Sequence, residues 1–303
     1  MGCNMSFEQL LCLFFLERNH RPATRRSYQN VIVQIIKFYP NKEPEQLSKF
    51  DLLEWRKHCL GKMTPITWNS YVRHLKAIFN YAIDNELFEY PKNLFKGLMV
   101  RPDKPKKKLL TERQIHFLEI SLENEEKLPH YLQPAYFTKA LIYTLRYTAI
   151  RQSQLLQLKI SDIDMTSKII NIRAETNKNH EHHEIPISDK LYPYLKRLIL
   201  ELRARSVTSD EQLFNINRFS LVTTSRNKNM TEGQLVHFFR HISKFIGFRV
   251  TSHRFRHTTA TEVLKQSGDI YAVKQLLGHK DLTVTLTYIH NDPEMLRKHV
   301  NSL

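Results

Sequence analysis

Four residues in the last sixth of the chain have the types and spacing needed to act on a phosphodiester: His253, Arg256, His279 and Tyr288. A nucleophile that attacks a DNA phosphate creates a transition state with extra negative charge on the non-bridging oxygens, and a guanidinium can neutralise that charge with two hydrogen bonds. A tyrosine hydroxyl becomes a competent nucleophile where cationic neighbours favour the phenolate. We therefore predict that this stretch holds a phosphodiester beside Tyr288.

Helical spacing indicates how these residues come together. His253 and Arg256 are three residues apart and share one face of a helix, whereas His257 is expected to point elsewhere and to be buried. Gly278 follows a short apolar run and is typical of a helix stop, which would leave His279 able to donate a hydrogen bond just beyond the helix end.

The sequence is strongly basic. Its 303 residues carry a formal net charge of +16 at pH 7 with a pI near 9.7, and 41% of them are hydrophobic, which suits a globular protein. Such an excess of positive charge favours a polyanionic partner, because each phosphate neutralised by lysine or arginine releases condensed counterions. Nucleic acid is the first candidate, and an acidic membrane surface is the second.

The membrane alternative has little support in the sequence. The apolar run Leu10–Leu16 is much shorter than the roughly 20 residues of a membrane-spanning helix, and nothing around it resembles a signal peptide. Cys3, Cys12 and Cys59 show no spacing typical of a metal site. We therefore expect a cytoplasmic protein with no membrane partner.

Helical periodicity and capping residues predict an all-helical unit over residues 1–100, with helices near 6–18, 24–39, 48–60 and 67–85. Residues 101–110 combine prolines with basic side chains, which predicts an extended connector. The connector is either a solvated linker or, as we prefer, a basic strap along a phosphate backbone.

Residues 111–303 are predicted to form a mainly helical domain with a small antiparallel sheet. The β-branched runs at 168–173 and 184–188 are expected to pair as strands. Helices are expected to begin at Thr111 and to cover about 134–148, 190–205, 231–246, 253–266, 270–277 and 282–289.

Several motifs, in order and at fitting spacing, carry a resemblance to a known family. The matching segments are TAIRQSQL at 148–155, HRFR at 253–256, LGH at 277–279, and the tyrosine nine residues after His279. On these segments the chain resembles the tyrosine recombinases, the phage-integrase and Xer-like enzymes, over nearly its whole length. The resemblance implies that 1–100 is a core DNA-binding (DNA-clamping) domain and 111–303 the catalytic domain.

The resemblance also implies a catalytic set. The family places a lysine in the hairpin between two strands, and counting back eight residues from Pro186 gives Lys178. A lysine there would protonate the departing 5′ oxygen. The implied set is Arg151, Lys178, His253, Arg256, His279 and the nucleophile Tyr288.

The implied reaction is cleavage and rejoining of DNA strands through a 3′-phosphotyrosyl intermediate, with neither a cofactor nor a metal. Its implied partners are double-stranded recombination sites, a homo-tetramer formed on DNA with a Holliday-junction intermediate, and an accessory DNA-bending or directionality factor. The tail at 291–303 resembles the element that docks into a neighbouring subunit. Two alternatives stay open: a monomeric type IB topoisomerase, and a sequence-specific DNA-binding protein that does not cleave.

Two residues depart from the family pattern. Ala149 stands where a glycine is usual and loses backbone freedom at a turn, and Gln154 replaces an acidic residue that could orient nearby cations. Separately, His180, His182 and His183 invite a zinc interpretation, but no second segment offers further ligands. We interpret this cluster as a hairpin tip near DNA and predict no metal site.

Overall fold

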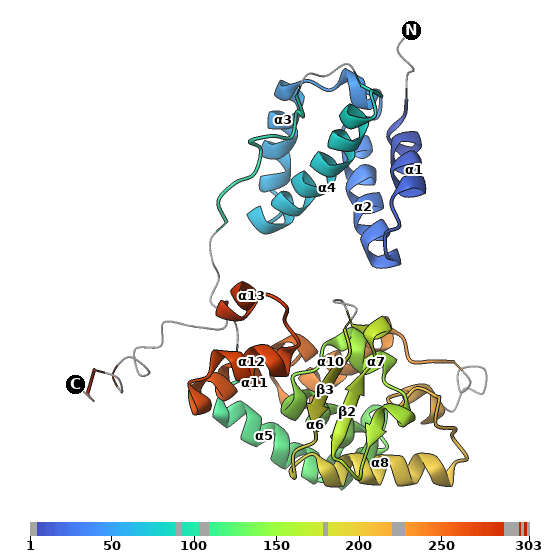
Figure 1. The fold of residues 1–303 in the computed structure, drawn as a ribbon, viewed down its shortest axis with the longest axis vertical. Helices are drawn as coiled ribbons and strands as arrows, with labels where there is room; N and C mark the ends of the chain where they lie inside the picture. Colours follow the sequence, from blue (N-terminus) through green and yellow to red (C-terminus); the bar gives the residue numbers. More distant parts are fainter. Residues whose placement is uncertain are drawn as a thin grey trace. The chain divides into compact units, whose positions relative to one another are not determined.

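The computed structural model describes residues 5–88, 92–102, 109–177, 181–219, 228–287, 297 and 300–301. The chain divides into two compact units, Met1–Lys106 and Lys107–Leu303, each of which is described by itself (Figure 1). Two predicted catalytic residues, Lys178 and Tyr288, lie outside the described residues, as do His180 and most of the predicted tail.

The first unit is a bundle of helices, as the periodicity predicted. Its core is built from fully buried aromatic and aliphatic side chains, among which the rings of Trp55 and Trp68 meet edge to face with centroids 5.2 Å apart. Its helices are α1 (Phe7–Glu17), α2 (Pro22–Phe38), α3 (Lys49–Leu60) and α4 (Pro65–Asp84).

Side-chain caps fix where several helices begin. The side chain of Ser6 accepts from the backbone N–H of Gln9, and the side chain of Gln9 accepts from the N–H of Ser6, which confirms the predicted capping box. Thr111 and Gln114 form the same arrangement at the start of the second unit's first helix. These pairs satisfy backbone donors that a helix start leaves without partners.

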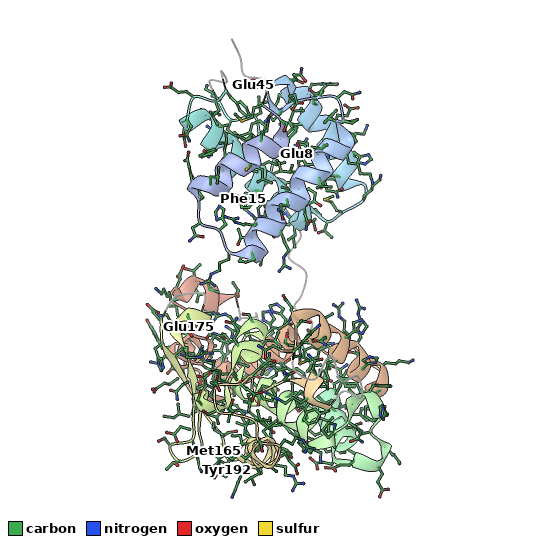
Figure 2. The ribbon with its side chains drawn as sticks, turned by 90° about the vertical axis from the view of Figure 1, so that its right-hand side faces the viewer. Glu8, Phe15, Glu45, Met165, Glu175 and Tyr192 are labelled. Atoms are coloured by element: carbon green, nitrogen blue, oxygen red, sulfur yellow. The ribbon has the colours of Figure 1, made fainter. Side chains whose placement is uncertain are left out.

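The second unit is mainly helical, which confirms the predicted fold class. Its central helix α6 is buried on nearly every side, and α8 and α11 both pack against it (Figure 1). Met165 and Tyr192, labelled in Figure 2, are partly buried against the same core. The helices are α5 (Glu112–Glu123), α6 (Ala135–Thr148), α7 (Gln152–Gln157), α8 (Tyr192–Ala204), α10 (Glu232–Ile246), α11 (Ser252–Ser267), α12 (Ile270–Leu277) and α13 (Leu282–Leu286).

A small antiparallel sheet covers part of this unit. Its strands are β1 (Ile163–Asp164), β2 (Ile169–Ile172) and β3 (His183–Pro186), in that spatial order. Ile170 faces Ile163 on one side and Ile185 on the other, so apolar side chains fix the register. The two predicted strands are confirmed: β2 lies within the predicted 168–173, whereas β3 begins one residue before and ends two residues before the predicted 184–188. The elements β1 and α7 were not predicted, because both are too short to show a periodic pattern.

No helix among the described residues is long and apolar enough to cross a membrane.

Candidate active site

The C-terminal end of α12 presents consecutive backbone carbonyls to two guanidinium groups. The Leu277 carbonyl accepts a hydrogen bond from Nη2 of Arg256 at 2.9 Å, and the Gly278 carbonyl accepts one from Nη2 of Arg151 at 3.3 Å. Carbonyls at a helix end lack intrahelical partners and carry the negative end of the helix dipole, so they suit cations. The helix end therefore gathers two positive charges that come from different elements.

Arg256 also ties α12 to the end of α6. Its Nη1 donates to the Ala149 carbonyl at 2.6 Å, and only 7% of the residue is exposed. A buried guanidinium is held by such carbonyls because each of its donors needs a partner. The side chain is consequently fixed in place before any phosphate arrives.

Ala149 supplies that carbonyl from an unusual backbone conformation. It caps α6 with φ of 52° in the left-handed region and is fully buried, with its methyl group packed in a small cluster with Ala260 and Leu277. The predicted loss of backbone freedom thus takes the form of a strained residue, at a cost of about 1–2 kcal/mol. Burial of the methyl group offsets about 0.8 kcal/mol of that cost.

We expect Ala149→Gly to change the free energy of unfolding by less than about 1 kcal/mol. Relief of the left-handed strain is opposed by loss of the buried methyl group and by the greater freedom of glycine in the unfolded chain. Urea denaturation measures the difference. A gain or loss above about 2 kcal/mol would contradict this explanation of the alanine.

Gln154 orients the backbone of Arg151. Its Oε1 accepts from the Arg151 backbone N–H at 3.0 Å, and its Nε2 lies 3.5 Å from Oδ1 of Asn177. The residue is 3% exposed, so these contacts are shielded from water. A neutral amide therefore holds the arginine segment in place without placing a negative charge beside the guanidinium.

His279 lies directly after the glycine stop, as predicted, and contacts Arg256. Its Nε2 is 3.1 Å from Nη2 of Arg256, and its Nδ1 is 2.9 Å from Oγ1 of the buried Thr285. A guanidinium only donates, so Nε2 accepts and a neutral ring carries its hydrogen on Nδ1, where it donates to Thr285. His279 thus donates a hydrogen bond beyond the helix end, as expected, and its acceptor is Thr285 on α13.

His253 and His257 form a close pair, which corrects one expectation. Their Nε2 atoms are 2.6 Å apart, and the rings meet edge to face with centroids 4.1 Å apart. His257 is buried as predicted, but the prediction that it points away from His253 is wrong. Residues four apart lie on one helical face, so His257 directly supports the exposed His253.

A pocket of about 600 Å³ brings four of the predicted residues together. Arg151, His253, Arg256 and His279 all line it. The predictions for Lys178 and Tyr288 lie outside the described residues. The described part of the site is therefore a cationic, imidazole-lined hollow in which two guanidinium groups are anchored by carbonyls.

Three of the polar residues at this pocket that were not predicted are joined by hydrogen bonds. Ser252 donates from Oγ to Oε1 of Gln152 at 2.7 Å, and Nε2 of Gln152 lies 3.2 Å from Oε1 of Glu232. This chain of contacts links the starts of α11, α7 and α10. Only the position of Gln152 within the TAIRQSQL segment, next to Arg151, could have drawn attention to it, since its partners are far away in the sequence.

Within the residues that the structure describes, no group of three histidine, cysteine, aspartate or glutamate side chains is placed to hold a metal ion. His182 and His183 of the considered cluster are described, whereas His180 is not.

Comparison with known proteins decides the family. A family model described as the phage integrase family matches residues 119–295. A putative tyrosine recombinase XerC from Pseudomonas aeruginosa is 31% identical over 99% of this chain and 72% of its own length. This chain belongs to the phage integrase family. The resemblance found in the sequence motifs is thereby confirmed.

One further relative and two solved structures are also similar to this chain. A putative tyrosine recombinase XerC from Pseudomonas syringae is 30% identical over 98% of this chain, which spans 64% of that relative's length. The Tn1549 transposon integrase, solved in complex with transposon right end DNA, has a TM-score of 0.72 at 21% identity and 99% coverage of each chain. A lambda integrase dimer bound to a core site has a TM-score of 0.71 at 17% identity, with 94% and 95% coverage. These likenesses in structure concern the fold.

Gly278, the glycine that precedes His279, is expected to stabilise the fold of this chain. Gly278 has a φ of +58°, and a Cβ there would lie 3.3 Å from Cδ2 of His183. We expect Gly278→Ala to lower the free energy of unfolding by about 1–2 kcal/mol through backbone strain, with a further loss where the His183 ring must move. Thermal and urea unfolding measure the loss, and Gly233→Ala, where a Cβ has room, is the control. Equal stability of Gly278→Ala and the unaltered chain would contradict the described turn.

Proposed function

We propose that this chain is a site-specific DNA recombinase that breaks and rejoins duplex DNA through a 3′-phosphotyrosyl intermediate. Such an enzyme integrates, excises, inverts or resolves a DNA element. The observation that carries the proposal is the pair of guanidinium groups of Arg151 and Arg256, fixed by neighbouring carbonyls beside one pocket. Preorganised donors of this kind stabilise the negative charge that develops on a phosphate under attack.

The reaction assigns a role to each candidate residue. The Tyr288 hydroxyl attacks the phosphorus and gives its proton to His253 or His279, the bond to the 5′ oxygen breaks, and Lys178 gives that oxygen a proton. Arg151 and Arg256 neutralise the non-bridging oxygens, while His253 and His279 position the phosphate or exchange protons. A 5′ hydroxyl from a second strand then attacks the phosphotyrosine and restores the phosphodiester.

The energy of the broken bond is retained in the phosphotyrosine, so the scheme calls for neither a nucleotide nor a metal ion. The hydrogen bond between Arg256 and His279 supports a coupled role for these two residues. A phosphate oxygen that enters the pocket can take a donor of Arg256, which releases Nε2 of His279 to take up a proton.

The partners follow from the same chemistry. The net charge of +16 favours duplex DNA, and the names of the relatives support recombination sites as its specific form. The proposal includes a homo-tetramer on two DNA sites, in which residues 291–303 of one subunit dock into a neighbouring subunit, and a Holliday-junction intermediate. It also includes an accessory DNA-bending or directionality factor, and it places the reaction in the cytoplasm.

Covalent trapping tests the proposal and identifies the target site in the same experiment. Genomic DNA of the source organism, nicked at random, is incubated with the protein, denatured, and searched for DNA that stays attached to protein. A nick next to the cleavage point lets the short fragment with the 5′ hydroxyl diffuse away, so the strand cannot be rejoined and the protein stays attached. We expect the attached fragments to share one short sequence, because the proposed recombinase is site-specific. Absence of attached DNA would contradict cleavage.

Relaxation of a supercoiled plasmid that lacks the recovered sequence distinguishes the topoisomerase alternative. A recombinase of this kind is expected to leave such a plasmid supercoiled. Efficient relaxation, together with attached fragments of unrelated sequence, would replace site-specific recombination by topoisomerase activity.

A further inference from the structure

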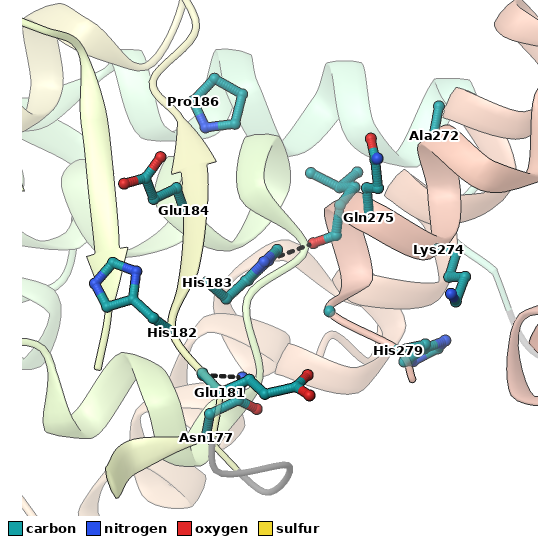
Figure 3. Close-up of a pocket in the computed structure, with 12 residues that line it drawn as sticks. Asn177, Glu181, His182, His183, Glu184, Pro186, Ala272, Lys274, Gln275 and His279 are labelled. Atoms are coloured by element: carbon teal, nitrogen blue, oxygen red, sulfur yellow. Dashed lines mark hydrogen bonds between the residues drawn. The ribbon is translucent and has the colours of Figure 1, made fainter. Parts of the chain in front are cut away.

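A histidine of the sheet completes the row of contacts on the end of α12. Nε2 of His183, the first residue of β3, lies 3.3 Å from the Leu276 carbonyl oxygen (Figure 3). The next two carbonyls, those of Leu277 and Gly278, accept from Arg256 and Arg151. Three successive carbonyls are thus each held by a side chain from a different element.

The ring of His183 also limits where the glycine turn can lie. A Cβ on Gly278 would be 3.3 Å from Cδ2 of His183 and 3.4 Å from its Nε2, so the ring lies close against the turn. The two residues line a pocket of about 520 Å³, separate from the pocket that contains the arginines, and His279 lines both. His183 therefore contacts the turn within a pocket that the two guanidinium groups do not line.

The hydrogen bond requires a defined form of the ring. A carbonyl oxygen only accepts, so Nε2 of His183 must carry the hydrogen. Burial lowers the pKa of His183 below its ordinary value, the contact with Leu276 opposes this effect, and the charges of Arg151 and Arg256 lower the pKa further. The ring is accordingly neutral at pH 7 and adds no charge that would repel the two arginines.

We propose that His183 is a positioning residue that holds the end of α12 so that its next two carbonyls aim Arg256 and Arg151 at the phosphate. The inference rests on the proposed function, since it names a residue that acts through the two arginines. A small displacement of catalytic groups is sufficient to slow a reaction by about 100-fold. The contact between β3 and α12 thereby becomes part of what sets the cleavage rate.

Two amide substitutions separate a hydrogen-bond role from a general structural one. In His183→Gln the side-chain nitrogen is as many bonds from Cα as Nε2 of histidine, so it can reach the Leu276 carbonyl. In His183→Asn the nitrogen is one bond closer to Cα and falls short. Because both variants are amides at the same strand position, a difference between them reports the hydrogen bond. His116→Gln, at an exposed position on α5, controls for the exchange of a histidine for an amide.

The first measurement is the single-turnover rate of covalent attachment to the DNA fragment recovered by trapping, together with the dissociation constant for that fragment. We expect His183→Gln and His116→Gln to stay within about threefold of the unaltered rate, and His183→Asn to be slower by about tenfold or more. All dissociation constants are expected to agree within about twofold. Equal rates for the Gln and Asn variants would overturn the inference.

The second measurement needs no DNA and so remains decisive if the proposed function fails. Nitrogen-15 NMR of the free protein reports the tautomer of His183 and the rotation of the Arg151 and Arg256 guanidinium groups. We expect hydrogen on Nε2 of His183, and guanidinium rotation that is restricted in the unaltered protein and in His183→Gln but faster in His183→Asn. Hydrogen on Nδ1 alone, or guanidinium signals unchanged in the Asn variant, would overturn the positioning role whether or not the protein cleaves DNA.

Discussion

Replacing Tyr288 with phenylalanine is expected to abolish covalent attachment to DNA, with a loss of at least about 1,000-fold in the cleavage rate. Phenylalanine lacks the hydroxyl oxygen that attacks the phosphorus, and the phosphate-binding groups cannot replace a nucleophile. Binding to the same fragment should change by less than about twofold, because the cationic pocket is unaltered. Denaturing gels measure attachment, and gel retardation measures binding.

Tyr271→Phe provides the matched control for this substitution. Tyr271 lies on α12 and is 64% exposed, so removal of its hydroxyl should leave attachment unchanged. Attachment that persists in Tyr288→Phe would contradict the assigned nucleophile. Loss of both binding and attachment in that variant would show that Tyr288 acts in DNA recognition instead.

The second large effect is expected for Arg256→Ala. This change removes a cation from the pocket and also leaves the Ala149 and Leu277 carbonyls without their donor. We expect cleavage to slow by about 100- to 1,000-fold, since loss of one fixed transition-state donor has effects of that size. The free energy of unfolding should fall by about 1–3 kcal/mol, because buried acceptors lose their partner.

Two further variants separate the parts of this effect. Arg256→Lys keeps the positive charge but cannot donate two hydrogen bonds in the fixed directions of a guanidinium group. Compared with Arg256→Ala, we therefore expect it to restore DNA binding more than the cleavage rate. Arg203→Ala, at an exposed position on α8, removes one positive charge elsewhere. Slowing of Arg203→Ala to the same degree as Arg256→Ala would contradict a local role and indicate an effect of net charge alone.

The sequence was sufficient to predict the structural features that depend on local patterns of residues. The capping box at Ser6 and the glycine stop at Gly278 appear as predicted, because each depends on residues a few positions apart. The HRFR and LGH segments could be assigned to one site because motif order and spacing carried the family resemblance. The elements β1 and α7 could not be predicted, since segments of two and six residues are too short to show a periodic hydrophobic pattern.

The contacts that organise the site depend on tertiary packing and were not predictable from spacing. Arg151 and Gly278 are 127 positions apart, and His183 and Leu276 are 93 apart, so no local pattern joins them. The direction of His257 was predicted wrongly although its spacing of four from His253 already favoured a shared face. The roles of Lys178 and Tyr288 remain predictions from the sequence motif.

The strained alanine shows how a departure from the family pattern can be accommodated. Ala149 adopts the left-handed conformation that a glycine would adopt easily, and its buried methyl group compensates for part of the strain. Its carbonyl still reaches Arg256, so the substitution leaves the anchoring of the guanidinium intact. Gln154 likewise preserves the orientation of Arg151 without the usual carboxylate.

The most direct test of the central claim is identification of the bond between protein and DNA. Protein attached to the recovered fragment is digested with trypsin and nuclease, and the nucleotide-bearing peptide is sequenced by mass spectrometry. Our account predicts a 3′ phosphate joined to the oxygen of Tyr288, with a free 5′ hydroxyl on the other side of the break. A phosphate joined to any other residue, or a link through the 5′ end of the DNA, would contradict it.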